Sequence, residues 1–383
     1  MIFDYNFKNY NFRIIFYMLA LSTLGVLVVA SASGQDRATV LKQIVGVAIA
    51  LVICIVISLI DYHKYFKFSS IIYVGCVSLL LAVLLIGKNT KGATRWLRIG
   101  GIQIQPSEFV KFGLIVILSW FLSKNQERIN APSVVGTAAL MCAVPLGMVY
   151  MQPNLSTTIV IAFTLVCIVY AAGLSYKWIV GVLAAGIPLT GLCLYLALFD
   201  MVPFLKKYQA QRILAKIFHS DSQYADLNRQ QDNSIMAIGS GQLNGKGLFN
   251  NTLSSVKNGN FLSEEQTDFI FAVIGEELGF IRSVIVILVY ALLVYECLYI
   301  ASRAKDTAGR LICTGMAALL AFQSFANIAV ATGIFPNTGL PLPFISSGLS
   351  SLLSLFNGMG NVLNIGLLRK NRHPYGGRLS IHK

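Results

Sequence analysis

The chain has 383 residues, of which 56% are hydrophobic and only 12% are charged. A soluble domain usually carries about 25% charged residues, and several apolar runs here reach the roughly 20 residues that a helix needs to cross a bilayer. This composition excludes a soluble globular protein, and we attribute the net charge of +14 to membrane topology and anionic lipid rather than to nucleic acid.

Ten apolar segments predict ten transmembrane helices, because backbone groups in lipid must find their hydrogen bonds within the segment. The spans are expected near residues 12–32, 40–60, 69–87, 107–123, 133–151, 155–173, 177–199, 284–302, 311–332 and 345–368. Residues 1–383 thus form a single all-α polytopic membrane domain. Lys and Arg gather in the segments that a cytoplasmic N-terminus would leave inside, so both termini are expected in the cytoplasm. The polar residues 200–283 are expected to form a large extracytoplasmic loop between the seventh and eighth spans.

The outer loop at residues 88–106 carries four cations on the side where cations are normally scarce. Arg95 and Arg98 lie beside Trp96. They could anchor the chain at the membrane interface, or they could bind phosphate groups, for which the Arg fork is geometrically suited. The sequence leaves both interpretations open.

The motif QPSEFVK, which follows this loop, is typical of a helix start, with Pro106 in the first turn and Glu108 favoured by the helix dipole. Lys111 follows Glu108 by three residues, so the two side chains can pair on one helix face. The alternative is that Lys111 lines a polar cavity.

Three further segments are rich in turn-forming residues. MQPNLST, at residues 151–157, predicts a tight turn between two apolar runs. GSGQLNGKGLFNNT, at 239–252, is glycine-rich but lacks the pattern of a phosphate-binding loop. The uncharged run 333–351 contains several prolines and glycines, and irregular backbone of this kind is tolerated at membrane depth only if it packs on protein or lines a cavity.

The stretch FLSEEQTDFIFAVIGEELGF holds five of the 16 acidic residues. Ser263 and Gln266 predict a capping box that starts a helix, with Glu264 and Glu265 in its first turn. Asp268 would fall beyond that turn among aromatic residues. Partial desolvation would raise its pKa, as suits a general base, so it is the functional candidate of the stretch.

The other two acids of this stretch, Glu276 and Glu277, precede Gly279, which is typical of a helix C-cap. Carboxylates at a helix C-terminus need a cation or water, and Arg282 is the nearest cation. We therefore interpret both acids as structural.

Cysteine and histidine give no sign of a metal centre. The seven cysteines all lie in apolar runs, where they are expected to be small buried hydrophobic residues. The four histidines are scattered without ligand spacing. No disulfide framework and no protein metal site are therefore expected.

Six segments, in this order, resemble the SEDS family (shape, elongation, division and sporulation), the RodA and FtsW proteins of bacterial envelope synthesis. They are RWLRIGGIQIQPSEFVK, QPNLST, YQAQRIL, AIGSGQLNGKG, TDFIFAVIGEELGF and NTGLPLPFISSGLSS. The ten-span hydropathy fits the same family. The short N-terminal segment and the modest C-terminal tail favour the RodA branch over FtsW.

The resemblance implies a glycosyltransferase that polymerises lipid II into glycan strands during cell elongation and releases undecaprenyl diphosphate. It implies a bacterial inner-membrane location and lipid II, the undecaprenyl-linked disaccharide-pentapeptide, as the substrate. It also implies a class B penicillin-binding protein as the crosslinking partner, together with other proteins of the elongation complex.

The resemblance also assigns residues. In the family the proposed catalytic carboxylate is the aspartate of the TDFIF motif, which corresponds to Asp268 here. The Glu and Lys of the family motif QPSExxK line a polar central cavity, and they correspond to Glu108 and Lys111 here. The other matching motifs supply the remaining candidates for substrate binding: Gln152, Arg212, Thr267 and Ser346.

Four positions depart from the family pattern. Asn154 replaces the Asp of the usual QPD motif, and Gln266 replaces the His before TD. Ser347 and Leu349 replace the Tyr and a Gly of PFISYGGSS. Any role that requires the acid of the QPD motif is lost or replaced here.

Joining a sugar hydroxyl to an anomeric carbon requires a base and stabilisation of the leaving diphosphate. Asp268 is the expected base. The expected diphosphate ligands are Arg95, Arg98, Lys111 and Arg212, with a divalent cation, Mg or Mn, as a further candidate. Because a diphosphate is already stable as an anion, a single inverting displacement needs one carboxylate rather than the two of an inverting glycosidase.

Two other functions fit the same sequence. A lipid II flippase or transporter would also need many spans and a polar cavity, and it would move lipid without forming polymer. A non-catalytic envelope scaffold would recruit a crosslinking partner and have no activity of its own. The concentration of unusual residues on one face favours chemistry.

Overall fold

The computed structural model describes residues 9–90, 93–99, 102–178, 225–250 and 265–368, with isolated residues between 180 and 215. Its long helices are α1 (Phe12–Ala32), α2 (Arg37–Ser58), α4 (Ser69–Ile86), α5 (Pro106–Lys124), α6 (Pro132–Met151), α7 (Leu155–Ala171), α10 (Ala225–Ser240), α11 (Ile270–Ser302), α12 (Thr307–Ala331) and α13 (Leu349–Leu367). Two short helices complete the set, α3 (His63–Lys67) and the 3₁₀ helix η2 (Gln126–Arg128).

Nine of the ten predicted spans coincide with one of these helices, and the span predicted at 177–199 lies largely outside the described residues. By length and composition, seven helices in the described part can cross a membrane, and α7 is a shorter apolar helix. The central helix is α13, which packs against α2, α5 and α12 and buries 15 of its 19 residues. The chain is therefore a polytopic, largely α-helical membrane protein.

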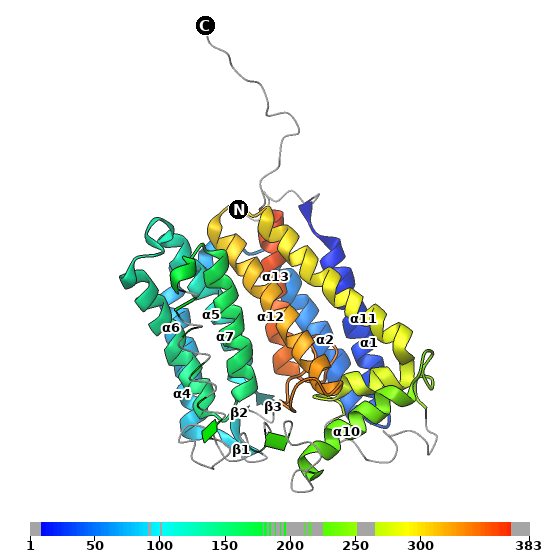
Figure 1. The fold of residues 1–383 in the computed structure, drawn as a ribbon. Coiled ribbons are helices and arrows are strands. Elements are labelled where there is room, and N and C mark those ends of the chain that lie inside the picture. Colours follow the sequence, from blue (N-terminus) through cyan, green and yellow to red (C-terminus); the bar gives the residue numbers. More distant parts are fainter. Residues whose placement is uncertain are drawn as a thin grey trace.

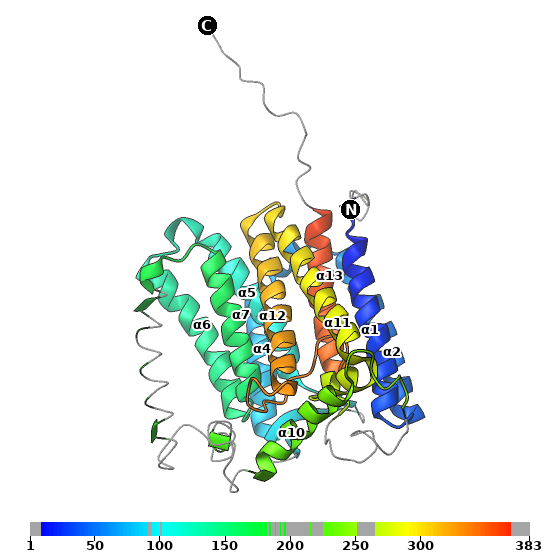
Figure 2. The ribbon, with the colours of Figure 1, turned by 45° about the vertical axis from the view of Figure 1, so that its right-hand side comes forward.

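The helices form one bundle with two distinct ends (Figures 1 and 2). α1 begins and α13 ends at one end, called the far end below. The opposite end carries a small sheet and is called the sheet end. Helix α10 lies across the sheet end rather than along the bundle (Figures 1 and 2).

Residues 88–106, predicted as an outer loop, contain a small sheet. Three antiparallel strands, β1 (Lys88–Thr90), β2 (Ala93–Ile99) and β3 (Ile102–Ile104), pair in chain order. The sequence contains a signal for this hairpin, because Gly100 and Gly101 separate two short β-branched runs as a two-residue hairpin loop requires.

The segment 200–283 is not one long loop. It contains α10, and α11 begins at Ile270 rather than near residue 284, so the end of the segment belongs to the bundle. The chain leaves helical geometry at Gly279 (φ 76°, ψ −177°), and the helix then resumes with a kink. Gly279 was predicted as a helix end; the backbone does break there, but α11 continues to Ser302.

Residues 335–348 form an irregular loop between α12 and α13, and side chains from the surrounding helices hold its carbonyl groups. Amide and hydroxyl groups donate to six of these carbonyls: Gln231 to Phe335, Ser156 to Thr338, Asn327 to Leu340, Gln323 to Pro341, Tyr290 to Pro343 and Gln43 to Ser346. The loop is packed on protein, as expected for irregular backbone in a membrane protein.

The approach of α1 to this loop depends on Gly25. A Cβ at Gly25 would lie 2.7 Å from Cα of Ile345, so only glycine allows the contact. Within the loop, buried Phe344 has a left-handed backbone (φ 64°), a costly conformation for an aromatic residue, and its ring packs edge-on against Phe356 with centroids 5.4 Å apart. Tertiary packing thus imposes the shape of the loop.

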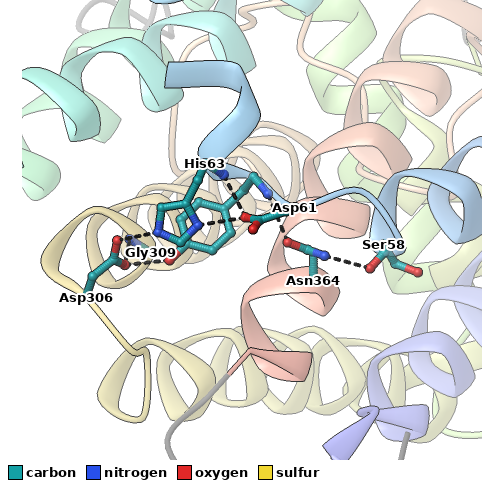
Figure 3. A network of polar contacts seen from close by, with 7 residues as sticks. Ser58, Asp61, His63, Asp306, Gly309 and Asn364 are labelled. Carbon is teal, nitrogen blue, oxygen red and sulfur yellow. Dashed lines mark hydrogen bonds and ion pairs between the residues drawn. The ribbon is translucent and has the colours of Figure 1, made fainter. Parts of the chain in front are cut away.

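At the far end, a polar network joins α3 to α12 and α13 (Figure 3). The His63 ring lies between two carboxylates, with Nδ1 2.6 Å from Asp61 and Nε2 3.0 Å from Asp306. The Tyr62 hydroxyl donates to Asp306 at 2.5 Å. Burial and this contact raise the pKa of the Tyr62 phenol. Burial alone would raise the pKa of Asp61, but the hydrogen bonds from His63 outweigh it and lower that pKa.

Asn364 closes the same network from α13 (Figure 3). Its Oδ1 accepts a hydrogen bond from the Tyr62 backbone N–H at 3.1 Å, and its Nδ2 donates to the Ser58 carbonyl at 2.9 Å. One buried amide thus satisfies two backbone groups in the turn between α2 and α3.

We predict that Asn364→Leu, which keeps the side-chain volume but removes both hydrogen bonds, destabilises the protein by about 1–3 kcal/mol for each backbone group left without a partner. Thermal unfolding of the purified protein in detergent measures this loss. The control is Asn125→Leu, because the Asn125 amide is half-exposed and bonds only to the Phe121 carbonyl of its own helix among the contacts described. Equal unfolding temperatures for the two variants would contradict the prediction.

Candidate active site

Asp268 lies at the sheet end on the turn 265–269 that precedes α11, and its side chain is half-buried. Its carboxylate faces Gly339 of the loop 335–348, since a Cβ at Gly339 would lie 3.1 Å from Oδ2 of Asp268. Gly339 has φ +69°, a conformation that favours glycine, so no side chain crowds this face of the carboxylate. The amino end of α11, which follows directly, stabilises negative charge at this position.

This position corrects the predicted capping box. Helix α11 begins at Ile270, its N-cap is Phe269, and no side-chain capping bond forms there. Gln266 and Glu265 therefore lie in the preceding turn rather than in the helix, while Ser263 and Glu264 lie outside the described residues. Asp268 therefore precedes the helix, whereas the capping box would have placed it inside the helix after the first turn. The contacts of residues 266 and 267 with the loop 335–348 hold this turn outside the helix.

Three hydrogen bonds from other elements fix the backbone around Asp268. The Asn327 amide donates to the Asp268 carbonyl at 2.8 Å and also to the Leu340 carbonyl. The Ser346 hydroxyl donates to the Thr267 carbonyl at 2.6 Å, and the Ser347 N–H donates to the Gln266 carbonyl at 2.8 Å. Two candidates, Thr267 and Ser346, thus contact each other beside Asp268 and position it.

Glu108 and Lys111 form the predicted ion pair, with 2.8 Å between Nζ and Oε1. Both side chains are buried within the bundle. Lys111 also donates to Oε1 of Gln323 at 3.0 Å, and Nε2 of Gln323 donates to the Pro341 carbonyl. The pair is therefore linked through Gln323 to the same loop that faces Asp268.

The two arginines of β2 diverge. Residues three apart on a strand point to opposite faces. Arg95 is half-buried and donates to the Pro153 carbonyl at the turn before α7, whereas Arg98 is exposed. The structure therefore does not bring these two side chains together, and Arg212 lies outside the described residues.

The turn at 152–154 is buried and brings Gln152 into the bundle rather than to the surface. Nε2 of Gln152 donates to the Leu80 carbonyl at 3.0 Å. Asn154 caps α7, with its Oδ1 accepting from the Thr157 N–H at 3.4 Å. An Asp can cap a helix in the same way, so the change to Asn154 keeps this structural role.

Several buried polar atoms at the starts of α5 and α7 have no hydrogen-bond partner within the described part of the chain. They are Ser107 Oγ, Glu108 Oε2, Gln152 Oε1 and Asn154 Nδ2. Buried polar atoms are almost always satisfied, so water or polar groups of a ligand are expected here. This supports the polar cavity expected around Glu108 and Lys111.

Glu276 and Glu277 form contacts within the fold, consistent with the structural interpretation. The prediction that Arg282 is their partner is wrong. Glu276 pairs with Lys246 at 2.8 Å, and Glu277 accepts from the Ser31 hydroxyl at 2.5 Å. Arg282 instead donates to the carbonyls of Asn244 and Leu278. Both carboxylates are buried, and the partners come from distant segments that spacing along the helix cannot reveal.

Sequence reasoning missed Gln323 and Asn327, which connect the site. They lie four residues apart on one face of α12, in a stretch where Ser324 is the other polar residue. Polar amides on one face of a membrane helix are a signal for interhelical hydrogen bonds, so their spacing could have marked them.

The chain is similar to known proteins over most of its length. The family model FTSW_RODA_SPOVE, described as a cell cycle protein, matches residues 12–371. The chain is 36% identical over 358 residues to the peptidoglycan glycosyltransferase MrdB of Escherichia coli strain K12, covering 92% of each chain. It is 32% identical over 373 residues to the probable peptidoglycan glycosyltransferase FtsW of Trichlorobacter lovleyi, covering 94% of each.

Solved structures show the same architecture. One belongs to a study of the structural coordination of polymerization and crosslinking by a peptidoglycan synthase complex; it matches with a TM-score of 0.78 and 26% identity over 93% of this chain and 97% of the other. The crystal structure of the rod shape determining protein RodA from Thermus thermophilus matches with a TM-score of 0.68 and 26% identity, over 96% and 99% of the two chains.

We predict that Lys111→Met destabilises the protein by about 3–5 kcal/mol, because it leaves the buried Glu108 carboxylate without its cation. The double variant Glu108→Gln/Lys111→Met should recover most of the loss, since it removes both charges. Thermal unfolding in detergent measures both effects. The control is Lys124→Met on the same helix, whose exposed ammonium lies 5.5 Å from the Trp120 ring and should matter little. A double variant as unstable as Lys111→Met would contradict the assignment.

Proposed function

The chain belongs to the FtsW, RodA and SpoVE family of cell cycle proteins, and we propose that it is a peptidoglycan glycosyltransferase that polymerises lipid II with Asp268 as its general base. Two relatives named as peptidoglycan glycosyltransferases match it over nearly their full length. The identity to MrdB, 36%, exceeds the 32% to the FtsW relative, which supports a role in elongation over division.

The observation that carries the assignment of the base is the setting of Asp268. The acids Glu108, Glu276 and Glu277 are buried and bonded to Lys111, Lys246 and Ser31 respectively. Asp268 is half-buried on a turn, so part of this residue stays accessible to substrate, while one side of its carboxylate packs against Gly339. A general base must reach the proton that it abstracts, and this geometry allows it.

The proposed reaction is a single displacement. The Asp268 carboxylate takes the proton of a sugar hydroxyl on the acceptor, and the hydroxyl oxygen attacks the anomeric carbon of the donor. The bond from that carbon to the diphosphate oxygen breaks, and undecaprenyl diphosphate leaves with the electron pair. The anomeric centre is inverted because attack and departure occur on opposite faces.

The leaving diphosphate needs positive potential, and two features of the sheet end provide it. Helices α5, α7, α11 and α13 all begin there, so their amino ends favour an anion. Arg98 is exposed and Arg95 half-buried on β2. Lys111 is already bonded to Glu108 and Gln323, and Arg95 to the Pro153 carbonyl, so we assign the diphosphate contacts to Arg98 and the helix ends.

A divalent cation stays a prediction. Among the described residues, no group of three or more His, Cys, Asp and Glu side chains could hold a metal ion. Addition of Mg or Mn to metal-depleted protein tests the requirement.

The expected partner and location follow from the same family. The solved peptidoglycan synthase complex supports pairing of this chain with a crosslinking enzyme of the class B penicillin-binding type, within an elongation complex. Because α1 begins and α13 ends at the far end, a bacterial inner-membrane orientation with both termini cytoplasmic puts Asp268 on the outer side, where lipid II is polymerised.

We predict that Asp268→Asn abolishes polymerisation, with at least about a hundredfold loss of rate, because the amide cannot accept the hydroxyl proton. Gel analysis of labelled lipid II products, with the crosslinking partner present, measures this. Folding is checked by the unfolding temperature, which should stay near that of the unsubstituted protein.

The matched control is Asp36→Asn, a change of an exposed acid at the same end. Asp36 caps α2 through its side chain, and Asn caps equally well, so activity should be unchanged. Polymer formation by folded Asp268→Asn would contradict the proposed base. Lipid II transport by the unsubstituted protein without any polymer would contradict the proposed function and favour a flippase.

A further inference from the structure

The glycine-rich segment 242–247 completes the hydrogen bonding of α11 across the kink at Gly279. In an unbroken helix the N–H groups of Phe280 and Ile281 would donate to the carbonyls of Glu276 and Glu277. Here Lys246 N–H donates to the Glu276 carbonyl at 2.9 Å and Gly247 N–H to the Glu277 carbonyl at 3.0 Å.

The other half of the broken ladder is satisfied by the same segment. Phe280 N–H donates to the Gln242 carbonyl at 2.8 Å, and Ile281 N–H donates to the Leu243 carbonyl at 3.2 Å. The two carbonyls and two N–H groups that the kink releases therefore all find partners in residues 242–247. We call this segment the wedge.

Glycine is required on both sides of this contact. A Cβ at Gly245 would lie 2.2 Å from the Glu277 carbonyl oxygen, and a Cβ at Gly279 would lie 2.2 Å from the Gly245 nitrogen. A Cβ at Gly241 would lie 2.0 Å from the Gly275 carbonyl oxygen. Gly241 and Gly245 of the motif GSGQLNGKG thus serve close backbone packing.

One ion pair joins the wedge to the short helix between Asp268 and the kink. Nζ of Lys246 lies 2.8 Å from Oε1 of Glu276, whose side chain is only 1% exposed. A buried carboxylate requires such a cation. The pair therefore holds the wedge against the first part of α11.

We propose that the wedge and the Lys246–Glu276 pair position the Asp268 carboxylate for catalysis by fixing the direction of residues 270–278. Ile270 and Gly279 are separated by about 14 Å along the helix at 1.5 Å per residue, so a tilt of about 4° at the kink moves the start of the helix by about 1 Å. A displacement of that size can cost about a hundredfold in rate. Lys246 is thus a positioning residue, and this role rests on the proposed function.

The other contacts of Asp268 explain why both supports are needed. Asn327 and Ser346 hold the backbone carbonyls of residues 267 and 268 to the loop 335–348. They fix one end of the short helix, and the wedge fixes the other. Without the wedge, a tilt at the kink is resisted only by the hydrogen bonds to the carbonyls of residues 267 and 268, so the start of the helix can shift.

The test compares Lys246→Met, Lys246→Arg and the double variant Lys246→Met/Glu276→Gln. The matched control is Lys42→Met, which removes an exposed lysine from α2. For each protein we would measure the unfolding temperature, the kcat and KM for labelled lipid II with the crosslinking partner, and hydrogen exchange of a peptide that covers residues 268–281.

Lys246→Met should lower kcat at least about tenfold with KM within about twofold, because geometry rather than substrate binding is lost. It should also raise hydrogen exchange in the 268–281 peptide. Lys246→Arg should restore most of kcat, and Lys42→Met should match the unsubstituted protein. The double variant should regain unfolding temperature but not kcat.

An unchanged kcat in folded Lys246→Met would overturn the proposal. Recovery of kcat together with unfolding temperature in the double variant would also overturn it, because it would assign Lys246 to stability alone. The outcomes for the two proposals can be distinguished. An inactive unsubstituted protein would refute the proposed function. The hydrogen-exchange comparison would still show whether Lys246 holds the wedge against the start of α11.

Discussion

The structure depends on one constraint: the irregular loop 335–348 is half-buried to fully buried, and its carbonyl groups must find hydrogen-bond donors inside the protein. Unpaired backbone groups away from water cost several kcal/mol each. Donors reach six of these carbonyls from α2, α7, α10, α11 and α12. The loop consequently joins helices that are far apart in sequence, and two of the residues that satisfy it, Gln323 and Asn327, also shape the site.

The candidate active site is built from the same donors. Gln323 connects the Glu108–Lys111 pair to the Pro341 carbonyl, and Asn327 connects the Asp268 carbonyl to that of Leu340. The Gln323 oxygen accepts from Lys111 while its nitrogen donates to the loop. The Asn327 nitrogen donates both to the Asp268 carbonyl and to the loop. A shift of the loop would therefore move the base and the buried ion pair together, which couples the fold of this end to its chemistry.

Much of this could be predicted from local patterns. Apolar length gave the positions of the spans, the three-residue spacing of Glu108 and Lys111 gave their ion pair, and Gly279 marked a break in the helix. The partners of Glu276 and Glu277 could not be predicted in this way. Lys246 lies 30 residues before Glu276, and Ser31 lies 246 before Glu277. Arg282 was nearer in sequence, but its side chain faces carbonyl groups instead.

The sequence by itself determined that this is a polytopic membrane protein, because hydrophobic length and backbone hydrogen bonding leave few alternatives in a bilayer. It also singled out Asp268, through the resemblance of its motif. Only the tertiary structure decided that α11 starts after Asp268, that residues 242–247 complete a broken helix, and that Lys111 also bonds to Gln323. Those outcomes depend on contacts between segments distant in the chain, where packing and the satisfaction of buried polar groups override local preference.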